Sequence, residues 1–139
     1  MGLAKKVINK MINGDAFSQW LGIEVLEITE GSCKLKMTVR KEMTNGFNIA
    51  HGGISYSLAD SALAFAANSD GIQSLSVETS ISHIKKVMIG DTLIAETQEI
   101  SKNDKSATYN INVTNQKKIE IANFKGKVYR TNKKWFPNQ

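Results

Sequence analysis

Hydrophobic and polar residues alternate with different periods along the chain, and each change of period predicts a new element. Apolar residues near the N-terminus recur at helical spacing, so residues 3–13 are predicted to form a short amphipathic helix. Asp15 can cap a second short helical turn. A run of β-forming residues then predicts a strand over 23–29, and strict alternation over 33–39 predicts a second, half-buried strand.

The period changes again in the middle of the chain. A polar, glycine-containing loop over 41–53 leads into an alanine-rich segment that runs to Asn68, where the apolar residues share one helical face: Ile54, Leu58, Ala62 and Phe65. Asp70-Gly71 ends this helix. The rest of the chain alternates as strands, at about 72–84, 91–101, 106–115 and 118–130. The helix is too hydrophobic for a surface position, which predicts an α+β fold with a curved antiparallel sheet around one long central helix.

Length and composition are typical of a globular protein. The 139 residues predict a single domain over 1–139, and 41% hydrophobic with 22% charged residues favours a folded chain. One cysteine, Cys33, cannot form an internal disulfide, and it lies on the alternating strand as an inward residue. No apolar run approaches the roughly 20 residues of a membrane helix, and the N-terminus lacks a secretory apolar region. We therefore expect a cytoplasmic protein that does not enter membranes.

The net charge of +5 is concentrated near the C-terminus. From Lys117 onward the chain carries seven basic residues and one acid, so this segment has a charge of +6 and the remainder −1. Of the 18 basic residues 16 are lysines, whereas proteins that read nucleic acids depend on the bidentate arginine side chain. We expect no nucleic-acid partner, and interpret the charge as a solvated lysine face or a site for a phosphorylated small ligand.

Candidate chemistry is densest between Thr44 and Asp60, in the segment TNGFNIAHGGISYSLAD. Gly52 and Gly53 directly precede the apolar helix, where the first N–H groups have no intrahelical acceptor. Together with the helix dipole, these N–H groups can stabilise a developing oxyanion. Two glycines can equally form a tight loop with no further role.

Asp60 is the second unusual feature of this segment. It lies in the middle of an apolar helix, where aspartate has poor propensity and an ionised carboxylate is costly to bury. Small and polar residues share its side of the helix and could line a cleft: Ser57, Ser61, Ala64 and Asn68. Asp60 is therefore a candidate general base or nucleophile, with a structural aspartate as the alternative.

Other chemistries find little support in the sequence. His51 and His83 are the only histidines, and no cluster of potential ligands has the spacing of a metal site. There is no glycine-rich phosphate loop, dinucleotide fingerprint or serine nucleophile elbow. We expect neither a metal nor a cofactor.

These residues together resemble a known family. Asn45, the run His51-Gly52-Gly53, and Asp60 nine residues after the histidine are similar to the motif of the hotdog-fold acyl-CoA thioesterases. The phenylacetic-acid-degradation type is the most similar group. The resemblance spans about residues 15–130 and includes Ile89-Gly90-Asp91-Thr92 before a strand.

The resemblance implies a catalytic site shared between two subunits whose sheets pair edge to edge. Gly52 would polarise the thioester carbonyl through its N–H, with His51 beside it and Gly53 in close approach to the substrate. Asp60 of the partner subunit would act as general base or nucleophile. Asn45 would hold the reacting group or water, and Ser76 matches a position that orients water in some members.

The same resemblance suggests where coenzyme A binds. Many relatives have a proline in the loop that here reads His83-Ile84-Lys85-Lys86-Val87, and this loop often borders the nucleotide of coenzyme A. Lys85 and Lys86 are therefore candidate contacts for the coenzyme A phosphates, with coenzyme A present as part of the substrate. Phe47 and Tyr56 could shape the acyl pocket or pack in the core.

The sequence predicts a homo-oligomeric acyl-CoA thioesterase, a dimer or tetramer, that forms a free acid and coenzyme A. Two alternatives remain: a hotdog hydratase or dehydratase acting on acyl thioesters, and a non-catalytic acyl-CoA-binding module. Aryl, hydroxyaryl and medium-chain acyl groups would all suit a pocket of Phe, Tyr, Leu and Met side chains.

Overall fold

The computed structural model describes residues 2–138 and contains three α-helices, one 3₁₀ helix and six strands among them. The helices are α1 (Leu3–Asn13), α2 (Ala16–Leu21), the 3₁₀ helix η1 (Lys41–Met43) and α3 (Gly52–Asn68). The strands are β1 (Glu24–Thr29), β2 (Ser32–Thr38), β3 (Ile72–His83), β4 (Thr92–Lys102), β5 (Ser106–Thr114) and β6 (Glu120–Lys134).

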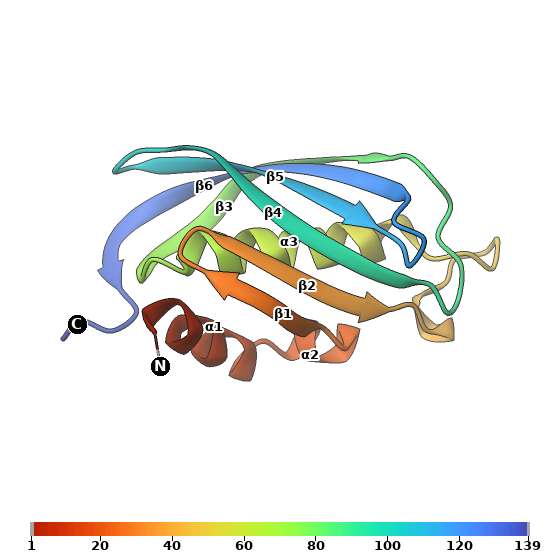
Figure 1. Cartoon of the computed structure of the whole chain (residues 1–139), viewed down its shortest axis with the longest axis horizontal. Helices are drawn as coiled ribbons and strands as arrows, with labels where there is room; N and C mark the ends of the chain where they lie inside the picture. Colours follow the sequence, from red (N-terminus) through yellow and green to blue (C-terminus); the bar gives the residue numbers. More distant parts are fainter. Residues whose placement is uncertain (1, 139) are drawn as a thin grey trace.

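All six strands form one antiparallel sheet in the order β1-β2-β4-β5-β6-β3. The sheet curves around α3, while α1 and α2 lie near β1 (Figure 1). Strands β1 and β3 are the two edges, and β3 pairs only with β6 in the described part of the chain. The class predicted from the sequence, a curved antiparallel sheet around one central helix, is confirmed.

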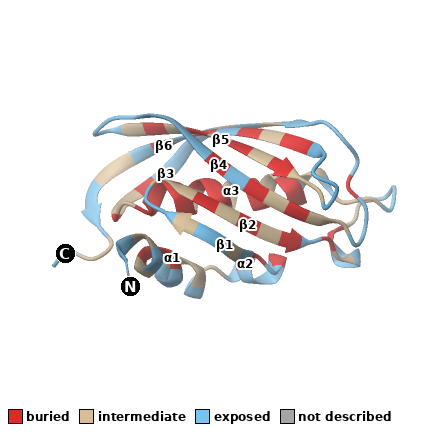
Figure 2. Cartoon of the chain, in the orientation of Figure 1, coloured by how far each residue is buried: buried red, intermediate tan, exposed pale blue. Residues whose placement is uncertain are grey.

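Most residues of the central helix are buried, as its alanine-rich sequence predicts (Figure 2), and one face is only partly buried, formed by Tyr56, Ser57, Asp60, Ser61 and Ala64. The face of the sheet toward α3 carries alternating apolar residues, for example Ala107, Tyr109, Ile111 and Val113 of β5. At Gly126 of β6 a Cβ atom would lie 2.5 Å from Leu63, so the helix and the strand approach this closely only because residue 126 is glycine. None of the helices in residues 2–138 is long and apolar enough to cross a bilayer.

Element boundaries differ from the sequence prediction in two informative places. The glycines do not precede α3, because Gly52 is its first helical residue. Strand β6 begins at Glu120 rather than 118, since Lys118 has a left-handed backbone (φ 61°) in a turn closed by Asn115, whose side chain accepts hydrogen bonds from the backbone of the turn. It then continues to Lys134, which pairs with Ile72.

Candidate active site

The start of α3 is held in place by backbone bonds on both sides. His51 N–H donates to the Met43 carbonyl and Ala50 N–H to the Val87 carbonyl, each over 2.8 Å. His51 is the N-cap, with an extended backbone (φ −60°, ψ 138°), and its Nδ1 accepts the N–H of Gly53 over 2.9 Å. The cap requires an unprotonated Nδ1, and it occupies the N–H of Gly53.

The N–H of Gly52 remains without an acceptor in residues 2–138. It lies at the positive end of a helix of 17 residues. Of the two glycines that the sequence singles out, only Gly52 therefore presents a free backbone donor, and the histidine before it consumes the other one.

A cavity of about 320 Å³ opens beside this donor and gathers four of the predicted site residues. Its lining comes from the loop before α3, the start of α3 and the end of β3: Asn45, Ile49, Ala50, Gly52, Ser55, His83, Ile84, Lys85, Lys86 and Val87. Lys85 and Lys86 are exposed at its rim. A neutral donor thus lies close to cationic side chains, an arrangement that suits an anionic ligand with a carbonyl group.

Asn45 points one end of its amide toward its own loop. Its Oδ1 accepts the N–H of Phe47 over 2.9 Å and that of Ile49 over 3.4 Å, which fixes the turn before α3. Its Nδ2 has no partner among the described residues. Only the amide nitrogen of Asn45 is therefore free to bind a ligand in the cavity.

His51 and Gly53 lie on the other side of the helix start. They line a separate hollow of about 310 Å³ together with Phe17, Trp20 and Ser57 among others. The structure thus divides the run His51-Gly52-Gly53 between two surfaces, because successive helical residues point about 100° apart.

Asp60 and Ser76 line neither of these cavities. Asp60 is half-buried, one turn after Tyr56, which bonds Thr79 of β3, and its carboxylate has no hydrogen-bond partner within the described residues. Burial raises the pKa of Asp60 above the ordinary value of an aspartate. Ser76 is exposed on β3, opposite Val128 of β6.

The polar side chains predicted to share the side of Asp60 are mostly paired within the described residues. Ser61 bonds Ser18 of α2, Ser57 donates to the Gly53 carbonyl, and Asn68 is buried and exchanges hydrogen bonds with Ser74. These side chains satisfy one another and the backbone, so Asp60 alone of this group keeps an unpaired polar end.

His83 is a cavity residue that the motif did not reveal. It is the last residue of β3, and a Cβ atom at Gly52 would lie 3.2 Å from its imidazole. The two-residue period of β3 could have predicted the side on which His83 lies, since it places His83 on the sheet face that covers α3, together with Thr79 and Ile81. Nothing in the sequence indicates that this face ends at Gly52.

The two aromatic candidates have different positions. Tyr56 bonds Thr79 and packs edge-on against Phe124, with ring centroids 5.1 Å apart, so it belongs to the core. Phe47 is 84% exposed at the tip of the loop before α3. Core packing is therefore wrong for Phe47, because the loop turns its side chain away from the sheet.

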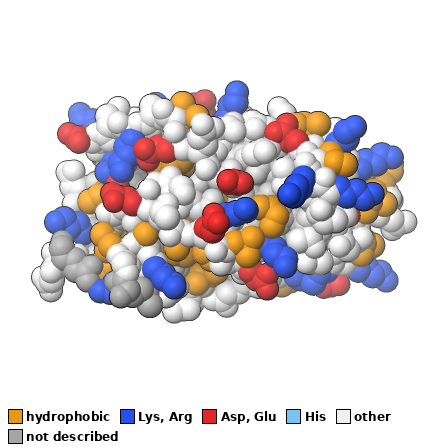
Figure 3. All heavy atoms as spheres, viewed as in Figure 1, with side chains coloured by type: hydrophobic (Ala, Val, Ile, Leu, Met, Phe, Trp, Pro, Cys, Tyr) orange, Lys and Arg blue, Asp and Glu red, His pale blue; other side chains and the backbone are white. Residues whose placement is uncertain are grey.

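The positive charge is distributed differently from the sequence prediction. Lys117 and Lys118 occupy the β5–β6 turn at the same end as Lys85, whose N–H bonds Ile121; Figure 3 shows several basic side chains at that end, on the right of the view. Lys125 and Lys127 lie on the outer sheet face, and Lys133 and Lys134 end β6 near Gly71 and Ile72. The charges that are concentrated in the sequence after Lys117 are therefore dispersed in space, since a strand of 15 residues separates its ends by tens of ångströms.

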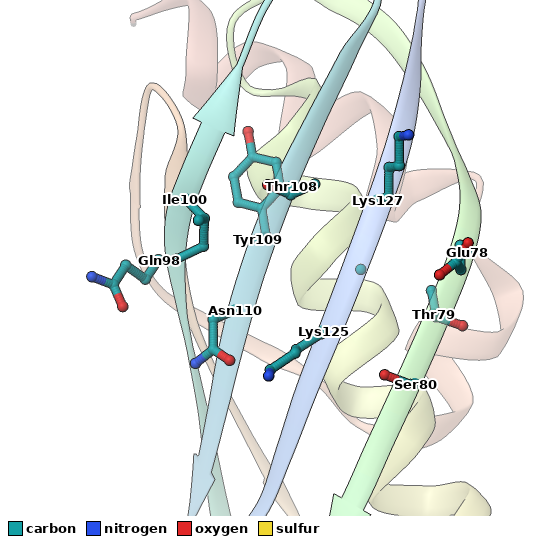
Figure 4. Close-up of a pocket in the computed structure, with 11 residues that line it drawn as sticks. Glu78, Thr79, Ser80, Gln98, Ile100, Thr108, Tyr109, Asn110, Lys125 and Lys127 are labelled. Atoms are coloured by element: carbon teal, nitrogen blue, oxygen red, sulfur yellow. The ribbon is translucent and has the colours of Figure 1, made fainter.

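The largest hollow, about 540 Å³, lies on the outer face of the sheet. Figure 4 shows Lys125, Lys127, Asn110 and Glu78 around it, with α3 behind the strands. It contains none of the residues predicted for catalysis, and no free N–H at a helix start is among its lining residues.

Two negative expectations concern metals and thiols. Residues 2–138 contain no group of three or more His, Cys, Asp or Glu side chains placed to hold a metal ion. Cys33 is buried, and this burial raises its pKa to about 12, so its thiol is not a nucleophile.

The fold and the cavity define the kind of protein, and comparison of the sequence with known proteins identifies its family. Residues 47–122 match the family model described as the thioesterase superfamily, and the chain belongs to this family. These residues include the start of α3, Asp60, and the loop with Lys85 and Lys86. The hotdog-fold resemblance noted in the sequence is confirmed.

Particular relatives narrow the family further. The chain is 36% identical to the acyl-coenzyme A thioesterase PaaI of Escherichia coli over 86% of each protein. A protein of Archaeoglobus fulgidus is 40% identical over 97% of this chain and 88% of that protein. The solved structure of E. coli PaaI, from the phenylacetic acid degradation operon, superposes with a TM-score of 0.92 at 34% identity and covers 94% of this chain and 95% of that one.

Proposed function

We propose that this protein is an acyl-CoA thioesterase that hydrolyses an acyl-CoA to a free acid and coenzyme A. The observation that carries the proposal is the unpaired N–H of Gly52, at the positive end of α3 and in one cavity with Asn45 and two lysines. The thioester carbonyl would accept this N–H, and the developing negative charge would strengthen the bond in the transition state. The kinship with E. coli PaaI supports the same activity.

The reaction requires a base for water or a direct nucleophile. With Asp60 as base, water loses a proton to the carboxylate and adds to the carbonyl carbon, after which the C–S bond breaks and the thiolate of coenzyme A leaves. With Asp60 as nucleophile, the carboxylate adds to the carbonyl carbon, the C–S bond breaks and the thiolate of coenzyme A leaves, and water then cleaves the resulting acyl-carboxylate anhydride to the free acid and Asp60. Single turnover in ¹⁸O-labelled water tests the nucleophile route, because water that attacks the Asp60 carboxyl carbon of the anhydride leaves ¹⁸O in Asp60, whereas the base route leaves none there.

Gly52 and Asp60 of one chain cannot serve the same substrate. They are eight residues apart on α3, which separates them by about 12 Å along the helix axis. The Gly52 N–H must reach the carbonyl oxygen while the Asp60 carboxylate reaches the attacking water or the carbonyl carbon, so both groups must lie within a few ångströms of the same thioester. The site is therefore incomplete in one subunit, and we propose that Asp60 of the partner subunit completes it.

Strand β3 offers the edge for this pairing. Its outer edge is unpaired in residues 2–138, and it exposes Leu75 (67%) and Val77 (61%), which favours association with a second strand. Along α3 and β3, Gly52 lies at the level of His83 and Tyr56 at the level of Thr79. By the same spacing we expect Asp60, one turn further, at the level of Leu75 and Ser76.

A two-fold axis near Thr79 and Ser80 would therefore bring Asp60 and Ser76 of one subunit to Gly52 of the other, which requires antiparallel β3 strands. We propose at least a dimer of this kind. A homotetramer, a single domain over 1–139, a cytoplasmic location and the absence of a cofactor are parts of the same proposal.

Subunit mixing tests the shared site. Asp60→Asn and Gly52→Pro are each expected to be inactive, but a heterodimer restores one complete site from the two intact halves. Mixtures with confirmed subunit exchange should therefore recover up to half of the wild-type activity per heterodimer. Exchange without recovery would place each site within one chain.

The activity itself is tested with a panel of aryl-, hydroxyaryl- and medium-chain acyl-CoA substrates, measured by release of free thiol. Release from at least one of them is expected. With an enoyl-CoA as an additional substrate, loss of enoyl absorbance without thiol release would instead identify a hydratase. Binding of acyl-CoA without either reaction would identify a binding module.

A further inference from the structure

The imidazole of His83 contacts the helix start from outside the motif. Its Cε1 and Nε2 both lie 3.2 Å from the place of a Cβ atom at Gly52, and it lines the same cavity as Gly52 and Asn45. The side chain is exposed, and neither ring nitrogen has a hydrogen-bond partner among residues 2–138. A polar ring with no structural bond therefore lies against the free backbone donor.

We propose that His83 Nε2–H is a second donor to the thioester carbonyl oxygen, beside the N–H of Gly52. The inference rests on the proposed thioesterase function and adds a residue to the oxyanion site. In this role His83 binds the oxygen of the reacting group and exchanges no proton with it, so the reaction balance given above is unchanged.

The distance between the two donors suits one oxygen. A Cβ atom lies about 2.5 Å from the backbone nitrogen of its own residue, so His83 Nε2 is at most about 5.7 Å from the nitrogen of Gly52. An oxygen that accepts two hydrogen bonds of about 2.9 Å can bridge donors up to about 5.8 Å apart. Both donors also face the same cavity, where such an oxygen has room.

Asn45 is the other neutral donor in this cavity, but its side chain has a different function in the fold. Its Oδ1 closes the loop before α3 through two hydrogen bonds. A substitution of Asn45 would therefore disturb the loop and the site together. His83 makes no such bond, so its substitution tests donation to the substrate with little effect on the fold.

The contact also gives a reason for glycine at position 52. An alanine there would keep the N–H, but its Cβ atom would lie 3.2 Å from the His83 ring and displace it by a few tenths of an ångström or more. Gly52→Ala and His83→Phe should then impair the same interaction. The double variant is expected to lose little more activity than the worse single variant, which is the signature of coupled sites.

Steady-state kinetics with the best acyl-CoA of the panel test the role. His83→Phe, which keeps a ring without a donor, should lower kcat about 10²-fold, the scale for loss of one oxyanion donor. KM and the dissociation constant of free coenzyme A, which has no thioester carbonyl, should stay within about twofold. His83→Gln retains an N–H donor, and its kcat should be at least tenfold higher than that of His83→Phe.

Ser82→Ala is the matched control, because Ser82 precedes His83 on β3 and points to the other sheet face. It should leave kcat, the melting temperature and the oligomer mass unchanged. If Phe at position 83 prevents folding, His83→Ala provides the same comparison with His83→Gln. A kcat within threefold of wild type for a folded His83→Phe or His83→Ala protein would overturn the inference.

The proposed thioesterase function and the proposed role of His83 can be refuted separately. A wild-type protein that releases thiol from no acyl-CoA would remove the proposed function together with the role of His83. Normal turnover in the wild type and in folded His83→Phe, with Gly52→Pro inactive, would remove His83 alone.

Discussion

The two ends of α3 differ in how their polar groups are satisfied. At the C-terminal end, Asn68 bonds Ser74 and the indole of Trp135, and Ser69 bonds Ala66 and Gly31. At the N-terminal end, the N–H of Gly52, the Nδ2 of Asn45 and the ring of His83 have no partner within the described chain. One helix thus has a closed structural end and an open end that faces a cavity. The open end is where chemistry is possible.

Two aspartates show the same difference. Burial alone would raise the pKa of Asp70, but hydrogen bonds from Lys102, Arg130 and the Ile72 backbone hold it below the ordinary value. Burial raises the pKa of Asp60, and no described group compensates it. Asp70 therefore stabilises the fold, whereas Asp60 is available to react.

The largest effect is expected at Asp60. Asp60→Asn should keep the fold and the oligomer but lower kcat at least about 10²-fold, because it removes a positioned base or nucleophile. Thiol release and the oligomer mass are the measurements. Activity near that of the wild type would exclude Asp60 from the mechanism.

Gly52→Pro removes the free N–H while proline remains compatible with the first helical position. Gly52→Ala is its control, since it adds a Cβ atom but keeps the N–H. The proline variant should be slower than the alanine variant by about 10²-fold, or about 3 kcal/mol of transition-state stabilisation. Equal rates per folded molecule would reduce the glycine to a structural role.

Asp70→Asn should do the opposite, lowering stability by about 3 kcal/mol and leaving kcat unchanged, because it leaves Arg130 without its partner. The folded pKa of Asp70 is lowered, so its stabilisation is present above the unfolded pKa of about 3.9 and disappears as pH falls through the folded value. Denaturation curves of variant and wild type should therefore converge in acid. A change in kcat at neutral pH would contradict the separation.

The pH dependence of kcat/KM follows from Asp60. The carboxylate must be ionised to act, and its pKa is raised, so activity should fall tenfold per unit on an acid limb that begins above about pH 4. Rates measured over a pH series in the range of stable fold locate this limb. A limb at or below the ordinary value of aspartate would show that Asp60 is not the titrating group.

The smallest effect is expected at the rim of the cavity. Lys85→Ala with Lys86→Ala should raise KM for acyl-CoA several-fold with little change in kcat, because these lysines attract the phosphates of coenzyme A. Raised salt should have a similar effect on the wild type. Lys133→Ala with Lys134→Ala removes the same charge from the other end of β6 and is the matched control.

Acyl-pantetheine, which lacks these phosphates, should respond to neither pair of substitutions. An equal response of acyl-CoA and acyl-pantetheine to the Lys85 and Lys86 changes would show that these lysines do not bind the phosphates.

Local patterns in the sequence were sufficient for the fold. The 3.6-residue period of 54–68 and the two-residue period of the strands each depend on which face is buried, and a burial face is encoded residue by residue. The apolar composition of α3 also implied a sheet on several sides of it. Gly52 is a candidate from its place at the start of an apolar helix, whereas Asn45 and the two lysines are candidates only through the family resemblance. All four line one cavity.

Only the tertiary structure decided how distant segments meet. His83 reaches Gly52 because of the register between β3 and β6 and the path of α3, which no local period contains. The lysines after residue 117 are separated because one long strand spans the sheet, and Phe47 is exposed because a loop turns outward. The 12 Å between Gly52 and Asp60 follows from the helical rise. This distance points to a site shared between subunits only in combination with the free edge of β3, which the tertiary structure shows. Periodicity is a property of neighbours in the chain, whereas a catalytic site depends on neighbours in space.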